Sequence, residues 1–381
     1  MLELEREGLK RELRSLETAQ CARVKVNGRE LLNFCSNNYL GLADDERLKA
    51  AAIKAVKEEG FGAGASRLVC GNMRSHRLLE KRLAQLKGAE DCLLFSTGYM
   101  ANVGIISSLF GPSDMIFCDR LNHASIIDGI LLSQAKFKRY GHADMKDLEE
   151  LLKSSTGPKR RVIITDSVFS MDGDLAPLDE IARLARRHEC MVMIDEAHAF
   201  GVMGETGKGL AEHFGVESQI DIQMGTLSKA AGAFGAYCCG SEKLISFLIN
   251  KARSFIYTTA MPPANAAAAL CAVEIIASEP ELRSRLWMHT NFLRQALSRA
   301  GFDTMRSETP IIPILVKDPI KTMLFSQRLL EEGVLISAIR PPTVPANTSR
   351  LRIAVTAKHA QKDLEFLLAK MALIGKELCL I

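Results

Sequence analysis

Asp195, His198 and Lys229 have side-chain types and a spacing that could do chemistry together. Asp195 ends the apolar run MVMID, His198 follows in DEAHAFG, and Lys229 lies among small residues in GTLSKAAGAFG. A carboxylate at the end of a buried strand can hold a proton on a heteroaromatic nitrogen, and a lysine can form a Schiff base. This pair is the minimum set for pyridoxal phosphate chemistry. An aspartate that only caps the turn after its strand is the alternative.

The same segment contains DEAH, which is also found at the magnesium site of helicase-type ATPases. That function needs a phosphate loop of the form GxxxxGK[ST]. The nearest candidate, GETGKGL, has Val202 in place of the first glycine and Gly209 after Lys208, so we exclude an ATPase. A second glycine-rich stretch, GFGAGAS at 60–66, follows a helical pattern instead of the strand that a dinucleotide fingerprint requires. It predicts a turn.

A phosphate group could bind where STGYMAN (96–102) opens a helix after the strand-like CLLF. The backbone amides of Gly98 and Tyr99 would face the anion at the positive end of that helix. Thr226 and Ser228, beside the lysine, add hydroxyl groups. His123, in DRLNHAS, is either a core histidine or a ring that stacks on a cofactor.

Strands and helices that could position these residues alternate from about residue 43 to 270. The pattern is carried by the segments CLLFST, MIFCD, MKDLEELLK, RVIITD, LDEIARLARRHE, MVMID and DIQMGTLS. Such alternation predicts an α/β fold with a mostly parallel sheet between helices, and ligands in such folds bind beyond the carboxyl ends of the strands. Asp166, Asp195 and the GTLSK turn each lie at or just past such an end.

Three parts are expected along the chain. Residues 1–42 form an N-terminal arm, with a helix followed by a hairpin at the NG of VKVNGRELLNF. Residues 43–273 form a large cofactor-binding domain, and residues 274–381 a small C-terminal α/β domain. The small domain is predicted from IIPILV, SQRLLEEG, VLISA, RLRIAVT and DLEFLLAKMALIGKEL, a β-α-β-β-α order.

Composition excludes several other classes of protein. A hydrophobic fraction of 47% and a net charge of +4, with scattered basic residues, predict a globular protein that does not bind nucleic acid. No stretch is apolar for long enough to span a membrane, so we expect a cytoplasmic protein and no membrane partner. The ten cysteines include no CxxC and the eight histidines are dispersed, so no metal site is expected.

Motifs along the chain resemble those of the α-oxoamine synthases, a family of fold-type I pyridoxal phosphate enzymes. The matching segments are NFCSNNYLGL, GAGASRLVCG, SHRLLEKRLA, FSTGYMAN, DRLNHAS, DSVFSMDGDLAPL, IDEAHAFGVMGETGKG, GTLSKAAGAFG and RPPTVPANTSRLRIAVTAKH. They extend from about residue 30 to residue 360. The resemblance implies the fold of that family, pyridoxal 5'-phosphate as cofactor, and a homodimer with shared active sites.

The resemblance also implies roles for individual residues. Lys229 matches the lysine that holds the cofactor and moves the substrate Cα proton, and Asp195 the acid that pairs with the ring nitrogen. His198 matches a histidine near the phenolic oxygen, and His123 one that stacks on the ring. Further implied contacts are those of Gly98, Tyr99, Thr226 and Ser170 with the cofactor, of Thr258 with the cofactor of the partner subunit, and of Arg14, Asn37 and Arg352 with the substrate.

Members of this family differ in the amino acid and the acyl thioester that they join. YTTAMPPA and RPPTVPANTSRLRI resemble the branch that condenses L-alanine with pimeloyl-CoA or a pimeloyl carrier protein in biotin biosynthesis. Ser228, where many relatives have glycine, and Asn38, where aspartate is frequent, depart from the pattern. The alternatives are three other branches of the family. One joins glycine to acetyl-CoA, one joins glycine to succinyl-CoA, and one joins serine to a long acyl chain. An aminotransferase and a non-catalytic protein of the same fold are the other rivals.

Overall fold

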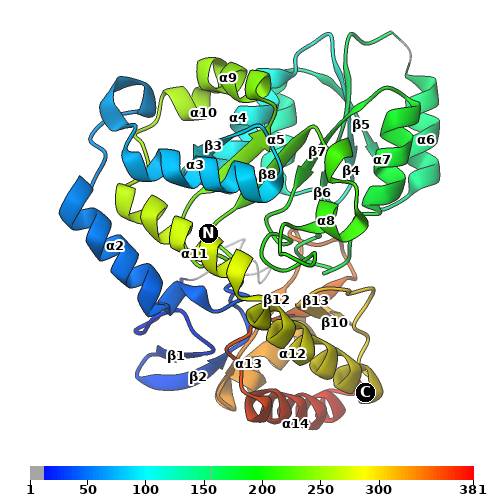
Figure 1. The fold of residues 1–381 in the computed structure, drawn as a ribbon. Helices are drawn as coiled ribbons and strands as arrows, with labels where there is room; N and C mark the ends of the chain where they lie inside the picture. The colour runs from blue at the N-terminus through cyan, green and yellow to red at the C-terminus, as the bar shows by residue number, and fades with distance from the viewer. Residues whose placement is uncertain (1–12, 156) are drawn as a thin grey trace, which may run out of the picture. The chain divides into compact units, whose positions relative to one another are not determined.

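Two units make up the computed structural model, which describes residues 13–155 and 157–381 (Figure 1). One unit contains residues 13–44, Met171–Asp174 and Ser284–Ile381, and the other contains Asp45–Ser170 and Leu175–Arg283, as far as these are described. The expected boundary at residue 273 falls inside helix α11 (Pro263–Ser278), which lies wholly in the larger unit. The division at 42 and 273 therefore stays a prediction about folding units.

A seven-stranded sheet forms the centre of the larger unit, in the order β3-β9-β8-β7-β6-β4-β5. Every neighbouring pair is parallel except those that β9 makes with β3 and β8. This is the mostly parallel sheet that the alternating pattern predicts. Its strands are β3 (Asp91–Phe95), β4 (Met115–Asp119), β5 (Lys136–Tyr140), β6 (Arg161–Asp166), β7 (Met191–Asp195), β8 (Ile222–Thr226) and β9 (Ala236–Gly240).

Helices cover this sheet and supply its apolar contacts. Both α4 and α3 pack on β3 and β9, α11 packs on α2 and α3, and α6 lies beside α7 (Figure 1). The helices are α2 (Glu46–Glu59), the π-helix η2 (Arg67–Gly71), α3 (Arg74–Lys87), α4 (Gly98–Leu109), α5 (Ala124–Ser133), α6 (Met145–Ser154), α7 (Leu178–Arg187), α8 (Leu210–Phe214), α9 (Glu242–Lys251), α10 (Arg253–Ile256) and α11, with short 3-10 turns η1 (Leu42–Asp44) and η3 (Glu217–Gln219).

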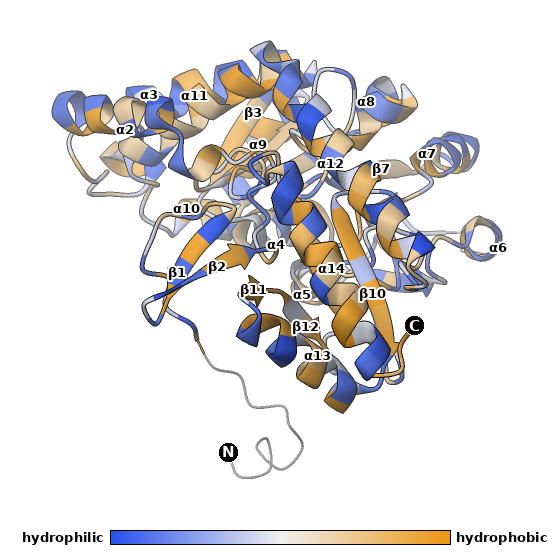
Figure 2. Ribbon diagram, turned by 90° about the horizontal axis from the view of Figure 1, so that it is seen from below, coloured by the Kyte–Doolittle hydropathy of each residue, from blue (hydrophilic) through white to orange (hydrophobic). Residues whose placement is uncertain are grey.

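The central strands are apolar along their whole length because helices cover both of their faces. All five residues of β4 and of β8 are buried, as expected for parallel strands inside an α/β layer. In Figure 2 the strand β3 is mostly orange, whereas α7 carries many blue residues. The apolar side of α7, which includes Leu178, Ile181 and Leu184, is buried.

Two strands of this sheet were not predicted from the sequence. Strand β5, KFKRY, lies at the sheet edge, and only its last residue is buried. Lysine and arginine on an edge strand discourage pairing with another chain, but they also remove the apolar run by which a strand is recognised. Strand β9, AYCCG, returns antiparallel from the GTLSKAAGAFG turn, so that turn forms the loop of a hairpin.

Two three-stranded sheets form the smaller unit, in the orders β1-β2-β11 and β10-β13-β12. The expected hairpin at NG is confirmed, because Val26 pairs with Arg29 and both Asn27 and Gly28 have positive φ, as a type I′ turn requires. The elements are β1 (Arg23–Val26), β2 (Arg29–Asn33), α12 (Pro280–Arg299, which begins in the larger unit), β10 (Ile311–Lys317), α13 (Pro319–Glu331), β11 (Val334–Leu335), β12 (Ser337–Ile339), β13 (Ser349–Ala354) and α14 (Gln361–Glu377).

The segment VLISA, expected as one strand, forms two strands in different sheets. Val334 and Leu335 pair in parallel with β2, whereas Ser337–Ile339 pair with β13. The N-terminal hairpin is thereby joined to the C-terminal residues, which explains why both group in one unit. The expected N-terminal helix falls mainly on residues 1–12, outside the described part, and residues 13–22 form no helix.

His359, in the smaller unit, makes the stability of the fold depend on pH. Its Nδ1 accepts the Thr356 amide at 3.0 Å, its Nε2 contacts the Asn33 carbonyl oxygen at 3.1 Å, and its ring stacks on Phe34. Burial lowers the pKa of His359 to about 4. The His359 imidazole therefore becomes protonated near pH 6.5 in the unfolded chain, but only near pH 4 in the folded chain.

We expect acidification from pH 7 to pH 4 to lower the free energy of unfolding by about 3 kcal/mol through His359. This contribution is complete above pH 6.5 and is lost as the pH falls towards 4. Urea unfolding at several pH values, for the parent chain and His359→Gln, measures it. The variant should show a shallower pH dependence across this window, and equal slopes would contradict the prediction.

Candidate functional site

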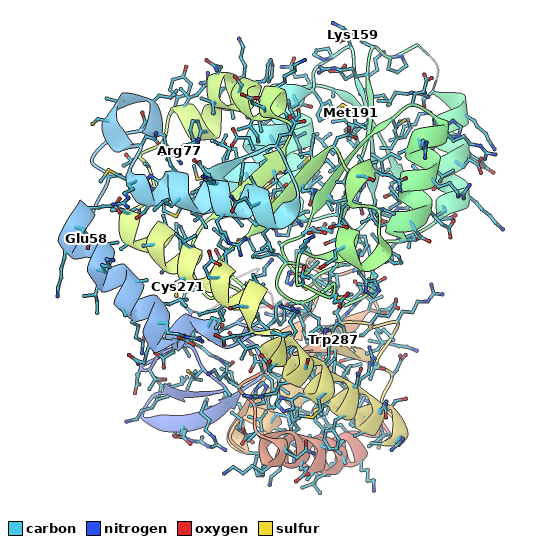
Figure 3. All side chains as sticks on the ribbon, in the orientation of Figure 1. Glu58, Arg77, Lys159, Met191, Cys271 and Trp287 are labelled. Carbon is cyan, nitrogen blue, oxygen red and sulfur yellow. The ribbon has the colours of Figure 1, made fainter. Side chains whose placement is uncertain are left out.

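Residues at the carboxyl ends of three neighbouring strands meet at one edge of the large sheet. Asp166 ends β6, Asp195 ends β7 and Thr226 ends β8, and in the register Asp166 lies opposite Asp195. Met191, labelled in Figure 3, marks the opposite end of β7. Parallel strands place all of these side chains at the edge where ligands bind in such folds.

The Asp195 carboxylate is buried and held at both oxygens. Its Oδ2 accepts a hydrogen bond from Asn102 Nδ2 at 2.8 Å, and its Oδ1 accepts one from the Ala197 amide at 2.8 Å. Asn102 also donates to Ser125 Oγ at 2.9 Å. These contacts fix the orientation of the carboxylate, so that its remaining lone pairs can accept a proton donor from a ligand.

His123 is connected to Asp195 through this network. Its Nδ1 lies 2.7 Å from Ser125 Oγ and also accepts the Ser125 amide. Burial lowers the pKa of His123, and Lys229 lowers it further, whereas Asp195 raises it. The ring is therefore neutral near pH 7, and it caps the first turn of α5.

Asp166 adds a second buried carboxyl group to the site. Its Oδ2 accepts the backbone amide of His123 at 2.6 Å. Burial raises the pKa of Asp166 well above its usual range, and the charge of Asp195 raises it further, whereas Lys229 lowers it. Two buried carboxyl groups on adjacent strands favour a cationic partner, and Lys229 is close enough to act on one of them and on His123.

Lys229 lies in the tight loop between β8 and β9. The Lys229 carbonyl accepts the Gly232 amide at 2.9 Å, and the Leu227 amide donates to the Gly235 carbonyl at 2.9 Å. The lysine is half-buried, and His198 is buried in the turn after β7. The loop therefore carries Lys229 on a closed backbone frame beside the end of β8.

The expected phosphate seat lies at the start of α4. An added Cβ on Gly98 would come within 4.0 Å of the Thr226 Cβ, so the helix begins directly beside the end of β8. The Thr97 side chain accepts the Met100 amide at 3.1 Å. The amides of Gly98 and Tyr99 are in the first turn, where no partner exists within the helix, so they can bind an anion.

The hydroxyl groups expected to bind phosphate point elsewhere in this structure. Thr226 Oγ1 donates to the Gly235 carbonyl oxygen at 2.9 Å, and Ser228 Oγ contacts the same oxygen at 3.4 Å. Either hydroxyl has to rotate before it can donate to a phosphate. The Tyr99 hydroxyl donates to Asp128 at 2.5 Å.

Ser170 and Thr258, the other two expected cofactor residues, also belong to the larger unit. Ser170 is half-buried in the turn that follows β6. Thr258 follows α10, and its side chain lines a small pocket with Arg67 and Ser96. The assignment of Thr258 to the site of a second chain stays a prediction.

Two of the expected substrate residues meet in the smaller unit although they are far apart in sequence. Arg352 Nη2 donates to Asn37 Oδ1 at 3.0 Å, and the Tyr39 hydroxyl donates to the same oxygen at 3.2 Å. Burial raises the pKa of Tyr39 to about 12, although Arg352 lowers it, so the phenol keeps its proton and can donate. This cluster can bind a carboxylate through the guanidinium group.

Arg14 lines a cavity of about 960 Å³ in the smaller unit. Cys35, Ile339 and Arg340 also line this cavity. Burial raises the pKa of the Cys35 thiol, and Arg352 and Arg14 are among the neighbours that partly offset this rise. Arg14 and Cys35 thus line the same cavity.

Sequence reasoning gave no role to Asn102, Ser125 or Tyr39. Each is in a segment that pointed to the site, namely STGYMAN, DRLNHAS and SNNYLGL. A polar residue buried among apolar neighbours in α4 was the available signal for Asn102, which is completely buried. Its partner could be known only once α4 and β7 were placed in three dimensions.

The residues of the larger unit fit pyridoxal phosphate. Asp195 is fixed as an acceptor for a ring nitrogen, His123 supplies a neutral ring, and Lys229 supplies an amine. Because Gly98 has no side chain, an anion can approach the backbone amides at the first turn of α4, beside Thr226. Each chemical group of the cofactor thus has a suitable partner in this unit.

The family of the chain follows from comparisons with known proteins. The sequence profile of class I and II aminotransferases matches residues 29–371. A protein named 8-amino-7-oxononanoate synthase from Geobacter sulfurreducens is 53% identical over 382 positions, which cover 100% of this chain and 97% of the relative. A protein of the same name from Geobacter metallireducens is 52% identical over 375 positions, covering 98% and 96%.

Solved structures show the same fold. Serine palmitoyltransferase from Sphingomonas wittichii superposes with a TM-score of 0.96 at 32% identity, covering 100% of this chain and 98% of that one. An 8-amino-7-oxononanoate synthase from Francisella tularensis gives a TM-score of 0.80 at 29% identity, covering 91% and 98%.

The chain belongs to the class I and II aminotransferase family and has the fold-type I fold of pyridoxal phosphate enzymes. Within that family its relatives are α-oxoamine synthases, so it is a pyridoxal-phosphate-dependent acyltransferase. The expectations from the sequence motifs about family, fold and cofactor are confirmed.

Proposed function

We propose that the chain condenses L-alanine with a pimeloyl thioester and releases carbon dioxide. With pimeloyl-CoA the products are 8-amino-7-oxononanoate, carbon dioxide and free CoA, the 8-amino-7-oxononanoate synthase reaction of biotin biosynthesis. Relatives of that name, about half identical to this chain over its whole length, support this substrate pair. The observation that carries the chemistry is the buried Asp195 carboxylate, fixed by Asn102 near Lys229.

Residues of the larger unit have distinct roles in this proposal. Pyridoxal phosphate, when bound, supplies an electron sink for negative charge that develops at the substrate Cα. Asp195 accepts the ring N–H and keeps that proton in place. Lys229 removes the Cα proton through its Nζ atom and later returns one, while His123 and His198 hold the ring. The first turn of α4, at Gly98 and Tyr99, binds the phosphate, together with Thr226 and Ser228. Ser170 lies next to the cofactor in this proposal.

Residues of the smaller unit bind the substrates. Arg352 and Asn37 hold the carboxylate of alanine, because a planar guanidinium matches a carboxylate with two parallel hydrogen bonds. Tyr39 keeps Asn37 and Arg352 aligned through its hydroxyl. Arg14, at the cavity beside Cys35, contacts the acyl substrate.

A panel of substrates tests the proposal. Release of free CoA is measured for alanine, glycine and serine, each combined with pimeloyl-CoA, acetyl-CoA and palmitoyl-CoA. Alanine with pimeloyl-CoA should give the highest kcat/KM. A higher value for glycine with acetyl-CoA or for serine with palmitoyl-CoA would assign the chain to another branch of the family. Conversion of alanine to pyruvate that depends on an added α-keto acid as amino-group acceptor, without CoA release, would indicate an aminotransferase.

Arg352→Ala is expected to weaken alanine binding by about 10- to 100-fold, since a hydrogen bond to a charged group contributes about 1.5–3 kcal/mol. The affinity is measured by spectroscopic titration of the cofactor-loaded protein with alanine. Arg306→Ala, on the same unit, serves as the control. An alanine affinity that stays within twofold of the parent value would remove Arg352 from the carboxylate site.

We also propose that two copies form a dimer, with Thr258 of each reaching the site of the other. Support comes from large apolar side chains on the larger unit, since Phe61, Val69 and Tyr257 are 80%, 78% and 72% exposed. η2, which contains Val69, contacts α10, which precedes Tyr257. Large apolar side chains that are exposed in a single chain are typical of a surface that a partner protein covers.

Sedimentation should therefore give twice the chain mass of 41.9 kDa. Val69→Asp introduces a charge into the proposed interface and is expected to shift the protein towards the monomer and reduce activity. Leu373→Asp is the matched control, because Leu373 is a large apolar residue of α14 in the smaller unit that is 52% exposed. A parent chain that sediments as a monomer, or a Val69→Asp variant that stays dimeric, would argue against this interface.

The reaction is proposed to take place in the cytoplasm. None of the ten cysteines, all within the described residues, forms a disulfide, a pattern typical of reducing compartments. Among the described residues, no helix has both the length and the apolar character to cross a membrane.

A further inference from the structure

Glu196 is a buried acidic residue between two site residues, and the proposed chemistry does not use it. It follows Asp195 directly and precedes His198 by two positions. Its side chain is completely buried, and so is its partner Lys87, at the end of α3, whose side chain is 1% exposed. Arg77, labelled in Figure 3, lies near the other end of the same helix.

The contacts of this pair join three separate segments. Lys87 Nζ lies 2.5 Å from Glu196 Oε2 and 2.5 Å from the carbonyl oxygen of Lys208. Glu196 Oε1 accepts the Ala211 amide at 3.0 Å, at the start of α8. The end of α3, the turn after β7 and the loop before α8 are thus fixed to one another by two buried side chains.

Glu196 also organises the backbone around the site residues. Its amide donates to the Met224 carbonyl of β8 at 2.8 Å, and its own carbonyl accepts the amides of Ala199 and Phe200. His198 lies inside that turn. The carboxylate approaches Gly209 so closely that an added Cβ there would lie 1.9 Å from Glu196 Oε2.

Stability alone is a weak reason for such a pair. Moving two charges out of water costs several kcal/mol for each ion, and apolar residues of similar volume often give equal or greater stability. The pair instead fixes the position of the turn after β7, because Lys87 and Glu196 each bond to defined partners in other segments. The two motifs that suggested an ATPase, DEAH and GETGKG, are therefore parts of one frame.

We infer that the Lys87–Glu196 pair positions Asp195 and His198 for the cofactor, so that Lys87 and Glu196 are positioning residues of the reaction. This inference rests on the proposed function for its kinetic part only. Both residues act through the turn that they fix, and neither is assigned a contact with substrate or cofactor. Small displacements of reacting groups, of about 1 Å, can reduce a rate by about 100-fold.

The test uses a neutral double variant, Lys87→Met with Glu196→Gln, so that no unpaired charge is left in the core. The matched control is Arg160→Met with Asp114→Asn. That pair is joined at 3.0 and 2.7 Å, and its two residues directly precede β4 and β6, at the amino ends of these parallel strands. For each protein, the measurements are thermal unfolding of the cofactor-free chain, the dissociation constant of pyridoxal phosphate by absorbance titration, and kcat and KM.

We expect the Lys87/Glu196 double variant to bind pyridoxal phosphate at least about 10-fold more weakly and to lose at least about 10-fold in kcat. The control double variant should keep both values within twofold. Glu196→Gln alone carries the same expectation if the double variant does not fold. Lys87→Arg keeps the positive charge, so this variant should bind pyridoxal phosphate nearly as tightly as the parent chain does.

Cofactor affinity and kcat within twofold of the parent, together with lower thermal stability, would overturn the inference and leave the pair a purely structural one. Equal losses in the control variant would do the same. If the parent chain binds pyridoxal phosphate but releases no CoA, the proposed function fails. The effect of the pair on cofactor affinity is still measured in that case, so the two failures are distinguishable.

Discussion

Lys229→Ala is expected to lower kcat/KM by at least about 10³-fold and to leave a folded protein. The substitution removes both the amine that bonds to the cofactor and the base that moves the Cα proton, and a positioned base alone contributes about 10²- to 10⁴-fold. The closed loop between β8 and β9 keeps its backbone hydrogen bonds, because these involve the Leu227, Lys229 and Gly235 main chain.

The matching spectroscopic result is loss of the covalent link to the cofactor. After addition of pyridoxal phosphate, treatment with borohydride and denaturation, the parent chain should retain the cofactor and Lys229→Ala should not. Lys243→Ala, an exposed lysine on α9 of the same unit, is the control and should behave as the parent does. Turnover of Lys229→Ala at near the parent rate would show that another residue is the base.

Asp195→Asn is expected to lower kcat by about 10²- to 10³-fold, the second-largest effect. The amide keeps the size of the side chain but loses the charge that holds a proton on the ring nitrogen, and breaking a buried charged pair costs about 3–5 kcal/mol. Asn102 then faces an amide in place of a carboxylate. Steady-state kinetics and cofactor titration measure the loss.

A matched substitution separates this effect from simple damage to β7. Asp221 accepts the Val192 amide at 2.8 Å, near the other end of the strand, so Asp221→Asn changes the same chemical group away from the site. We expect that variant to keep kcat within about twofold, since surface changes are usually small. An Asp195→Asn enzyme with the parent kcat would exclude Asp195 as the ring-nitrogen partner.

The sequence was sufficient to predict the elements that position the cofactor residues. Apolar runs ending in Asp166 and Asp195 predicted parallel strands, and both strands end at those residues. Burial on both faces makes such strands easy to recognise. Edge strand β5 has three exposed positions, and without an apolar run it gave no signal.

Contacts between distant segments were beyond sequence reasoning. Asn37 and Arg352 were both expected in the substrate site from the resemblance alone, and only the fold brings them to 3.0 Å. Tyr39 and Asn102 act on them and on Asp195 through single hydrogen bonds that no spacing predicts. The direction of the Thr226 hydroxyl, towards Gly235, also depends on how the loop closes.

The DEAH segment is informative as part of the candidate cofactor site and not as a magnesium-binding motif. As a magnesium box it failed because GETGKGL lacks the first glycine of a phosphate loop. In the structure its aspartate and histidine belong to the candidate site, while Glu196 pairs with Lys87 in the core. The motif alone does not show the partners of Glu196, which lie in α3 and β8.

The central claim, a decarboxylative condensation of alanine, is tested most directly with L-alanine labelled in its carboxyl carbon. Incubation with pimeloyl-CoA and the cofactor-loaded protein should release labelled carbon dioxide and free CoA in equal amounts, with the Cα carbon retained in 8-amino-7-oxononanoate. Labelled pyruvate in place of labelled carbon dioxide, or carbon dioxide release that does not require pimeloyl-CoA, would contradict the account.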